Sequence, residues 1–232
     1  MREFIKEIQY KNRNPRDVKA LALLDDISTN PERVLPVGMG LFRGRIIDDV
    51  TKINKEKGYF GYGAKDSFIP PAKATKDLRA NYRYISYLYC TNHPYTALVE
   101  VRPRLGARVS IATIRVNQEL HLLDLSMLYS KPVTVDDDVL DYIPTQYIAE
   151  YAKNLGYDGI AFRSSLTPEL NDQDTLMHQE LDRYNVVIFT YEKCMPIKSN
   201  VVEVTTNYVE CQQVDEDEEL LNINTTLLDM WL

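Results

Sequence analysis

Residues 79–103 read RANYRYISYLYCTNHPYTALVEVRP, and the rest of the chain is organised around this stretch. Apolar and tyrosine side chains alternate over residues 84–89, which predicts a β-strand. The Asn-His-Pro sequence at 92–94 is a turn signal, and a proline there suits the first turn of a helix. Apolar residues at helical spacing over 95–101 predict a short helix, which Pro103 ends. The stretch is therefore predicted to form a strand–turn–helix unit.

The acidic residue in this predicted helix is Glu100, which lies between Val99 and Val101. A carboxylate between two valines is paired, exposed or functional. A functional carboxylate at this point would stabilise a positively charged oxocarbenium ion or bind ribose hydroxyls. The structural alternative is an ion pair with Arg102 or Arg104, and the residues alone leave both open.

Composition excludes several classes of protein. The 232 residues suit one large domain with extensions, and 44% hydrophobic residues exclude a disordered chain. A net charge of −7 argues against a nucleic-acid-binding surface. No apolar run is long enough to span a membrane, and the N-terminus lacks the apolar core of a signal peptide. Three cysteines without paired spacing and three scattered histidines predict a cytoplasmic protein with no disulfide framework and no metal site.

The order of the other elements predicts an α+β fold with a mixed β-sheet core. We expect a helical N-terminal extension over 1–36, a catalytic domain over 37–200, and an acidic and apolar C-terminal tail over 201–232. The extension contains a helix whose apolar positions run from Val18 to Ile27. Within the domain, hydrophobic patterns predict strands after the glycine-rich segment at 36–40 and at 109–115, 120–125, 157–162 and 184–189, with a helix over 142–155 that Gly156 ends.

Two groups of arginines are candidate anion-binding residues. Arg43 and Arg45 share one face of a predicted strand, where their guanidinium groups suit a phosphate. Arg79 lies before the next predicted strand, with Asn81 shaping the turn between them. The structural alternatives are surface arginines paired with acids for Arg43 and Arg45, and a helix C-terminal arginine for Arg79.

Tyrosines and serines give further candidates. Any of Tyr84, Tyr87 and Tyr89 can stack on a flat ligand ring, although a strand tyrosine is more often part of the core. Ser164 and Ser165 end an apolar strand, where a hydroxyl can bind a carboxamide or phosphate, or can cap a helix or turn. A Gly-x-Ser-x-Gly sequence is absent, so a hydrolase nucleophile is not predicted.

Taken in order, these pieces resemble the RES domain family, which is named for an arginine, a glutamate and a serine. The resemblance covers roughly residues 38–192, and its most specific parts surround Glu100 and Ser164. The pieces are Arg43 in its strand, Arg79-Ala-Asn81, Ile85-Ser-Tyr-Leu-Tyr89, Thr96-Ala-Leu-Val-Glu100, Gly156-Tyr-Asp-Gly-Ile-Ala-Phe-Arg-Ser164-Ser165 and Asn185-Val-Val-Ile-Phe189.

The resemblance implies a fold similar to ADP-ribosyltransferase toxins, with NAD as substrate and no metal. It implies an enzyme that breaks the bond between nicotinamide and ribose. By position, Arg43 and Arg79 would hold the phosphates of NAD or of the acceptor, and Tyr89 would line the nicotinamide–ribose region. Glu100 would stabilise the ribosyl cation, and either Ser164 or Ser165 would be the family serine. The serines, Tyr89 and Asn81 would bind the substrate.

Family members differ in acceptor and partner. Some are NAD phosphorylases that pass ADP-ribose to inorganic phosphate, others modify a protein, and many are toxins of toxin–antitoxin pairs. We therefore expect ADP-ribose transfer to phosphate or water, with protein ADP-ribosylation as the first alternative and a non-catalytic module that binds a nucleotide or partner as the second. The retained Arg79, Glu100 and serine disfavour the second alternative. The long loop over 45–78 and the acidic tail depart from short family members and leave an antitoxin partner and the oligomeric state open.

Overall fold

The computed structural model describes residues 2–15, 32–48, 53–55, 58–126, 139–164, 166 and 183–206. Three expectations concern other parts of the chain and lie outside these residues: the helix from Val18 to Ile27, the position of Ser165, and the tail after residue 206. None of the described helices is long and apolar enough to cross a membrane.

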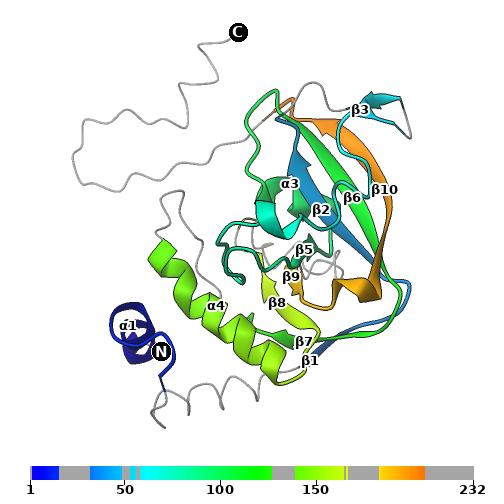
Figure 1. The fold of residues 1–232 in the computed structure, drawn as a ribbon. Coiled ribbons are helices and arrows are strands. Elements are labelled where there is room, and N and C mark those ends of the chain that lie inside the picture. Colours follow the sequence, from blue (N-terminus) through cyan, green and yellow to red (C-terminus); the bar gives the residue numbers. More distant parts are fainter. Residues whose placement is uncertain are drawn as a thin grey trace, which may run out of the picture.

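An eight-stranded sheet forms the centre of the molecule (Figure 1). Its strand order is β1-β7-β8-β9-β5-β2-β6-β10; β7 and β8 are parallel and all other neighbours are antiparallel. This mixed sheet, packed against helices, confirms the predicted α+β class. The strands are β1 (Glu32–Leu35), β2 (Gly40–Ile46), β5 (Leu88–Thr91), β6 (Arg108–Val116), β7 (Leu120–Asp124), β8 (Gly159–Arg163), β9 (Tyr184–Ile188) and β10 (Cys194–Glu203), and a separate hairpin holds β3 (Ile53–Asn54) and β4 (Tyr59–Phe60).

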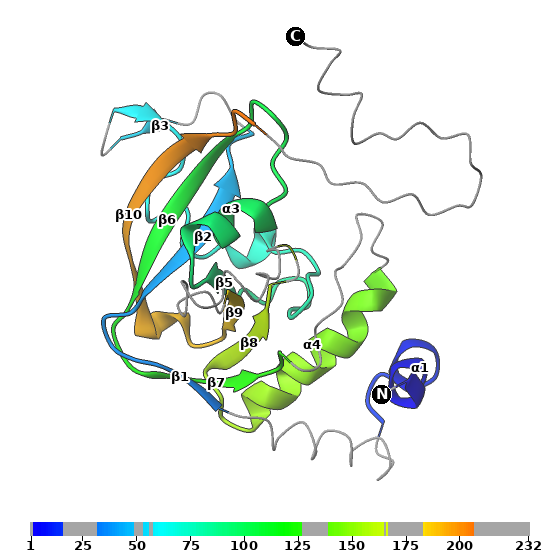
Figure 2. The same ribbon diagram turned by 180° about the vertical axis from the view of Figure 1, so that it is seen from behind.

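Within the described residues, three α-helices accompany the sheet: α1 (Arg2–Tyr10), α3 (Pro94–Glu100) and α4 (Val139–Asn154). Short 3₁₀ turns, η1 (Ala72–Ala74) and η2 (Tyr191–Lys193), interrupt the connections. Figures 1 and 2 show α1 lying beside α4 at the edge of the molecule. The Phe4 ring meets the Tyr147 ring edge-on at 5.6 Å, and Gln9 Nε2 donates to the Leu140 carbonyl at 2.9 Å. The N-terminal helix is thus attached to the domain through α4.

The hydrophobic core has two main parts, one on each face of the sheet. On one face α4 buries Ile148, Ala149 and Ala152 against β-strand side chains such as Ile160 and Val187. The opposite face carries the fully buried set Leu41, Leu88, Ile114, Leu122 and Ile188. Burial of apolar area on this scale is the main term that stabilises such a domain.

Helix α3 packs closely against β2, and Gly44 permits this contact. A Cβ at Gly44 would lie 2.2 Å from the carbonyl oxygen of Ala97, which is closer than any real Cβ contact. Phe42, two residues away on the same side of β2, packs on the same small cluster as Ala97. The helix begins as predicted: Pro94 is its first residue, and His93 Nδ1 accepts a hydrogen bond from Tyr95 N at 3.2 Å.

Several predicted boundaries were wrong. The strand expected from residue 84 begins only at Leu88, because Tyr84 has φ 73° and the preceding residues form turns. Residues 32–35, expected in the helical extension, form edge strand β1, which pairs with β7. Strand β10 was not predicted, and it continues to Glu203, past the expected start of the tail at 201. Helix α4 begins three residues before the predicted 142 and ends at Asn154, with Gly156 in the left-handed region at φ 92°.

We expect Gly44→Ala to lower the free energy of unfolding by about 1–3 kcal/mol, because the added methyl group forces α3 away from β2. Urea unfolding of the two proteins measures the difference. Gly40→Ala is the matched control, since a Cβ there meets nothing within 4 Å. Equal stability of wild type and Gly44→Ala would contradict the close contact.

Candidate active site

The carboxylate of Glu100 is held by two neutral donors from neighbouring strands. Ser164 Oγ and Asn185 Nδ2 each donate to Glu100 Oε1 at 2.7 Å. Ser164 is buried, whereas Glu100 and Asn185 are half-buried. Within the described residues, Glu100 forms no ion pair with Arg102 or Arg104, so the structural alternative from the sequence does not apply. Glu100 Oε2 has no hydrogen-bond donor among the described residues and is left for another group.

Sheet register explains why these three residues meet. Ser164 directly follows the last residue of β8, and its backbone N–H donates to the carbonyl of Arg183 at 3.1 Å. Asn185 lies near the start of β9, paired with Phe162 on one side and Thr91 on the other. Helix α3 follows β5 after a short turn, so its last residue, Glu100, returns over this point of the sheet.

Tyr89 and Asn81 form a second group beside this one. The Tyr89 hydroxyl donates to Asn81 Oδ1 at 2.6 Å and accepts from Ala80 N at 3.2 Å. Asn81 is fully buried, and its Nδ2 donates to the carbonyls of Lys76 and Tyr82. Asn81 therefore shapes the turn before β5, as the sequence suggested, and its side chain is occupied by this turn and by Tyr89.

Arg43 and Arg79 both lie near Tyr89. Burial raises the pKa of Tyr89, and the hydrogen bond from Ala80 and the charges of Arg43 and Arg79 oppose that rise. Arg43 Nη1 donates to the carbonyl of Tyr89 at 3.2 Å, while its Nε is buried without a partner among the described residues. The Arg79 carbonyl accepts from Thr145 Oγ1 on α4. The charges of both arginines thus act on Tyr89, the residue that the resemblance assigns to the nicotinamide–ribose region.

The remaining sequence candidates lie elsewhere. Arg45 donates to the Asp66 carbonyl and lies 3.6 Å over the Tyr62 ring, so it does not form a fork with Arg43. Tyr87 is a core residue, because its hydroxyl donates to Glu150 at 2.7 Å and its ring packs 4.7 Å from Phe189. Tyr84 is exposed.

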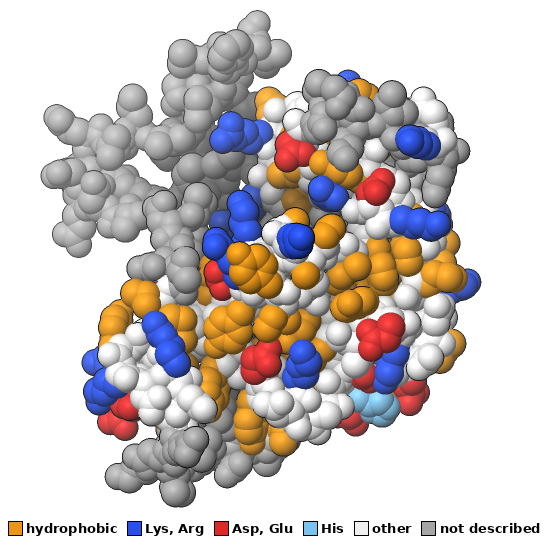
Figure 3. Space-filling view, viewed as in Figure 1, with side chains coloured by type: hydrophobic (Ala, Val, Ile, Leu, Met, Phe, Trp, Pro, Cys, Tyr) orange, Lys and Arg blue, Asp and Glu red, His pale blue; other side chains and the backbone are white. Residues whose placement is uncertain are grey.

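Two neighbours of the site were missed from the sequence. Asn185 appeared there only as part of an apolar strand, although an asparagine inside YNVVIF is an unusual polar residue for a buried strand and is the one signal that could have found it. Arg183, whose carbonyl holds Ser164, places its guanidinium 5.3 Å from the Tyr95 ring centroid. Figure 3 shows lysine and arginine side chains gathering on this face around α3.

Thiol and metal chemistry receive no support from the described residues. Burial raises the pKa of Cys90 to about 12 and that of Cys194 to about 11, so both thiols stay protonated near neutral pH. The part of the chain that the structure describes contains no group of three or more His, Cys, Asp or Glu placed to hold a metal ion.

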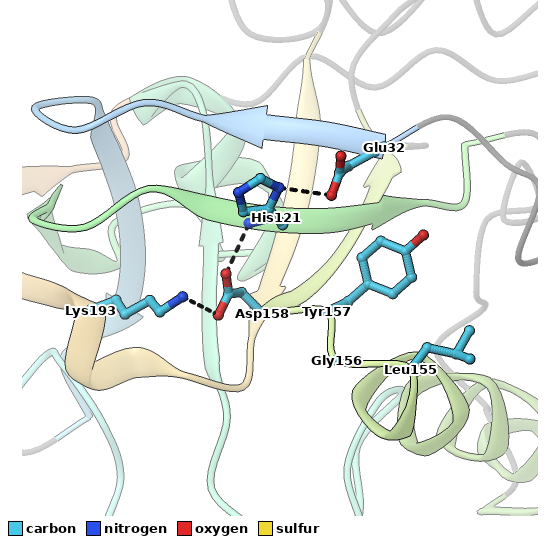
Figure 4. A pocket seen from close by; sticks show the side chains of 7 residues that line it. All are labelled: Glu32, His121, Leu155, Gly156, Tyr157, Asp158 and Lys193. Atoms are coloured by element: carbon cyan, nitrogen blue, oxygen red, sulfur yellow. Dashed lines mark hydrogen bonds and ion pairs between the residues drawn. The ribbon is translucent and has the colours of Figure 1, made fainter.

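A pocket at the opposite end of β8 is a structural junction. Figure 4 shows its charged residues pairing with one another: Lys193 Nζ lies 2.7 Å from Asp158 Oδ1, and His121 Nδ1 lies 2.8 Å from Glu32 Oε1. Asp158 Oδ2 also accepts from His121 N at 3.0 Å. Because these groups neutralise one another and tie β1, β7, β8 and η2 together, the pocket is a weaker candidate than the Glu100 site.

The described residues form an α+β domain, and Glu100 with its two neutral donors is its candidate site. The RES domain family matches residues 52–206, well over half of the chain, and the chain belongs to this family. Arg43 precedes the matched segment. A solved chain from the M. tuberculosis MbcT–MbcA toxin–antitoxin complex is 13% identical, with a TM-score of 0.45, covering 79% of this chain and 92% of that one. Comparison with curated proteins gave no match.

We expect Tyr89→Phe to lower the free energy of unfolding by about 1–3 kcal/mol, because it leaves buried Asn81 Oδ1 without its donor. Thermal and urea unfolding measure this loss. Tyr84→Phe is the control, since this exposed tyrosine should change stability by less than about 0.5 kcal/mol. An equal effect of the two substitutions would show that Tyr89 does not hold the turn.

The stability contributed by Asp158 should depend on pH. Burial raises the pKa of Asp158, but hydrogen bonds and the charge of Lys193 outweigh it, and the net pKa lies below its ordinary value. A lowered folded-state pKa adds stability above the unfolded value of about 4 and loses it as pH falls through the folded pKa.

Asp158→Asn should therefore cost about 1.5–3 kcal/mol at pH 7, and the cost should shrink toward pH 3. Urea unfolding of both proteins across this range measures the difference. Asp66→Asn, at an exposed acid, serves as the control. A cost that is constant with pH would refute the ionic role of Asp158.

Proposed function

We propose that this protein is an NAD-consuming enzyme that cleaves the nicotinamide–ribose bond and transfers ADP-ribose to phosphate or water. The observation that carries the proposal is the Glu100 carboxylate, held through Oε1 by Ser164 and Asn185 at 2.7 Å each, while Oε2 accepts no hydrogen bond from the described residues. Membership of the RES domain family agrees with the use of NAD.

The chemistry needs a fixed negative charge more than a nucleophile. When the bond between ribose C1 and the pyridinium nitrogen breaks, its electron pair leaves with nicotinamide, which becomes neutral. The positive charge moves to the ribose as an oxocarbenium ion. A preorganised carboxylate beside that carbon stabilises the developing cation in the transition state. Glu100 is proposed to do this through Oε2, and Ser164 keeps the carboxylate in place.

Arg43 and Arg79 are proposed to hold the diphosphate of NAD or an acceptor phosphate. Arg43 Nη1 lies 3.2 Å from the Tyr89 carbonyl oxygen, and the charges of Arg43 and Arg79 both oppose the rise in the Tyr89 pKa that burial causes. Guanidinium groups suit phosphate oxygens, and two cations offset the diphosphate in a chain whose net charge is −7. Tyr89 is proposed to line the nicotinamide–ribose region between these cations and Glu100.

The second substrate completes the reaction at the same carbon. A phosphate oxygen attacks ribose C1 and forms ADP-ribose 1-phosphate, or water attacks, loses a proton to solvent and forms ADP-ribose. A protein side chain in the same position would give protein ADP-ribosylation. The similarity to a chain of a toxin–antitoxin complex gives no ground for assigning an antitoxin partner to this protein. The proposal therefore concerns the reaction alone.

We expect Glu100→Gln to lower the rate of nicotinamide release from NAD by at least about 100-fold, because the amide removes the negative charge and keeps the side-chain shape. Purified protein is incubated with NAD, with and without phosphate, and the products are resolved by chromatography. Glu192→Gln, at an exposed glutamate of η2, is the matched control and should keep full activity.

The products separate the alternatives. ADP-ribose 1-phosphate that forms only with phosphate identifies a phosphorylase, and ADP-ribose alone identifies a hydrolase. A labelled protein band from labelled NAD identifies a protein ADP-ribosyltransferase. Wild-type protein that releases no nicotinamide would refute the enzymatic proposal, and full activity of Glu100→Gln would refute the role of that carboxylate.

A further inference from the structure

Asn185 contacts Glu100 from the middle of the sheet. Its Nδ2 donates to Glu100 Oε1 at 2.7 Å, the same oxygen that Ser164 Oγ reaches at 2.7 Å. On β9 it is paired with Thr91 of β5 and Phe162 of β8, so strands on both sides fix its backbone. A donor on a central strand is held more rigidly than one on a loop.

The other half of the Asn185 amide has no partner in the part of the chain that the structure describes. Its Oδ1 is buried and accepts no hydrogen bond from the described residues. A buried acceptor without a donor destabilises the folded state. Turning the amide over would place Oδ1 against the Glu100 carboxylate, where two acceptors repel, so the negative charge of Glu100 fixes the orientation. The Asn185 amide therefore keeps its hydrogen bond to Glu100 although its buried Oδ1 lowers the stability of the folded state.

Helix geometry explains why Glu100 needs this donor. Glu100 is the last residue of α3, where the partial negative charge of the helix C-terminus opposes a carboxylate. Two hydrogen bonds to one oxygen offset this effect and restrict rotation of the carboxylate. Because both donors use Oε1, the other oxygen, Oε2, which accepts no hydrogen bond from the described part of the chain, has one fixed direction.

We propose that Asn185 is a positioning residue that aims Glu100 Oε2 at the ribose carbon from which nicotinamide leaves. This role rests on the proposed function and adds a residue to it. Asn185 acts through Glu100 and does not itself touch the substrate. It should therefore affect the rate of bond cleavage more than the binding of NAD.

The test compares Asn185→Ala with Asn185→Asp and with the control Asn117→Ala, an exposed asparagine in the turn between β6 and β7. Nicotinamide release gives kcat and KM for NAD, and urea unfolding gives stability. Asn185→Ala should lower kcat about 10- to 100-fold, the effect of one hydrogen bond to a charged group, with KM changed by less than about threefold. Asn185→Asp should lower kcat further, because its carboxylate repels Glu100. Asn117→Ala should match the wild type.

Stability distinguishes positioning from a structural role. Asn185→Ala removes the buried Oδ1, which favours the folded state, and also a donor to the Glu100 carboxylate, which disfavours it, so the variant should stay fully folded under the assay conditions. Unchanged kcat, a rise in KM alone, or a fall in kcat that goes with unfolding of the variant under the assay conditions would each overturn the positioning role. Wild-type protein without nicotinamide release would overturn the proposed function and this role together, whereas active wild type with unchanged Asn185→Ala would overturn the role alone.

Discussion

The charge on Glu100 is placed where the backbone opposes it. It stands at the C-terminal end of α3, whose partial negative charge destabilises a carboxylate, and it is half-buried. Taking a charge out of water is costly unless hydrogen bonds replace those to water. The sheet supplies them from Ser164 and Asn185, each at 2.7 Å. These donors reach Glu100 only if α3 lies directly on the sheet, which requires the missing side chain at Gly44.

Strand order brings the two donors together. Strands β8 and β9 are antiparallel neighbours, so the last residue of β8 and the first residue of β9 lie at the same end of the strands. Ser164 follows the last residue of β8, and Asn185 is the second residue of β9. Strand β5 is the next neighbour of β9 and leads into α3. The Glu100 carboxylate and both of its donors therefore lie together at one end of these three neighbouring strands.

Patterns local in sequence predicted the local structure. The start of α3 at Pro94 and the strands around 109–115 and 184–189 are correct because periodicity and turn residues determine them directly. The error at 84–87 arose because alternation cannot reveal that the chain turns at Tyr84, which has φ 73°, just after the segment that buried Asn81 holds. Strand β10 escaped prediction because its register shifts between Pro196 and Lys198 and breaks the alternation. The hydrogen bond between Asn185 and Glu100 joins residues 85 positions apart, so no local sequence pattern could predict it.

Two carboxylates at opposite ends of β8 show how the surroundings decide what a charge can do. Asp158, just before the strand, lies 2.7 Å from the Lys193 ammonium group. This cation neutralises the Asp158 carboxylate and leaves little negative electrostatic potential to attract a ligand. Glu100, which meets Ser164 just after the strand, is held by a hydroxyl and an amide, neither of which carries charge. Neutral donors fix a carboxylate without cancelling its negative potential. One end of β8 thus lies next to an acid whose charge is cancelled, and the other end lies next to an acid that is fixed and keeps its charge, as the proposed stabilisation of a ribosyl cation requires.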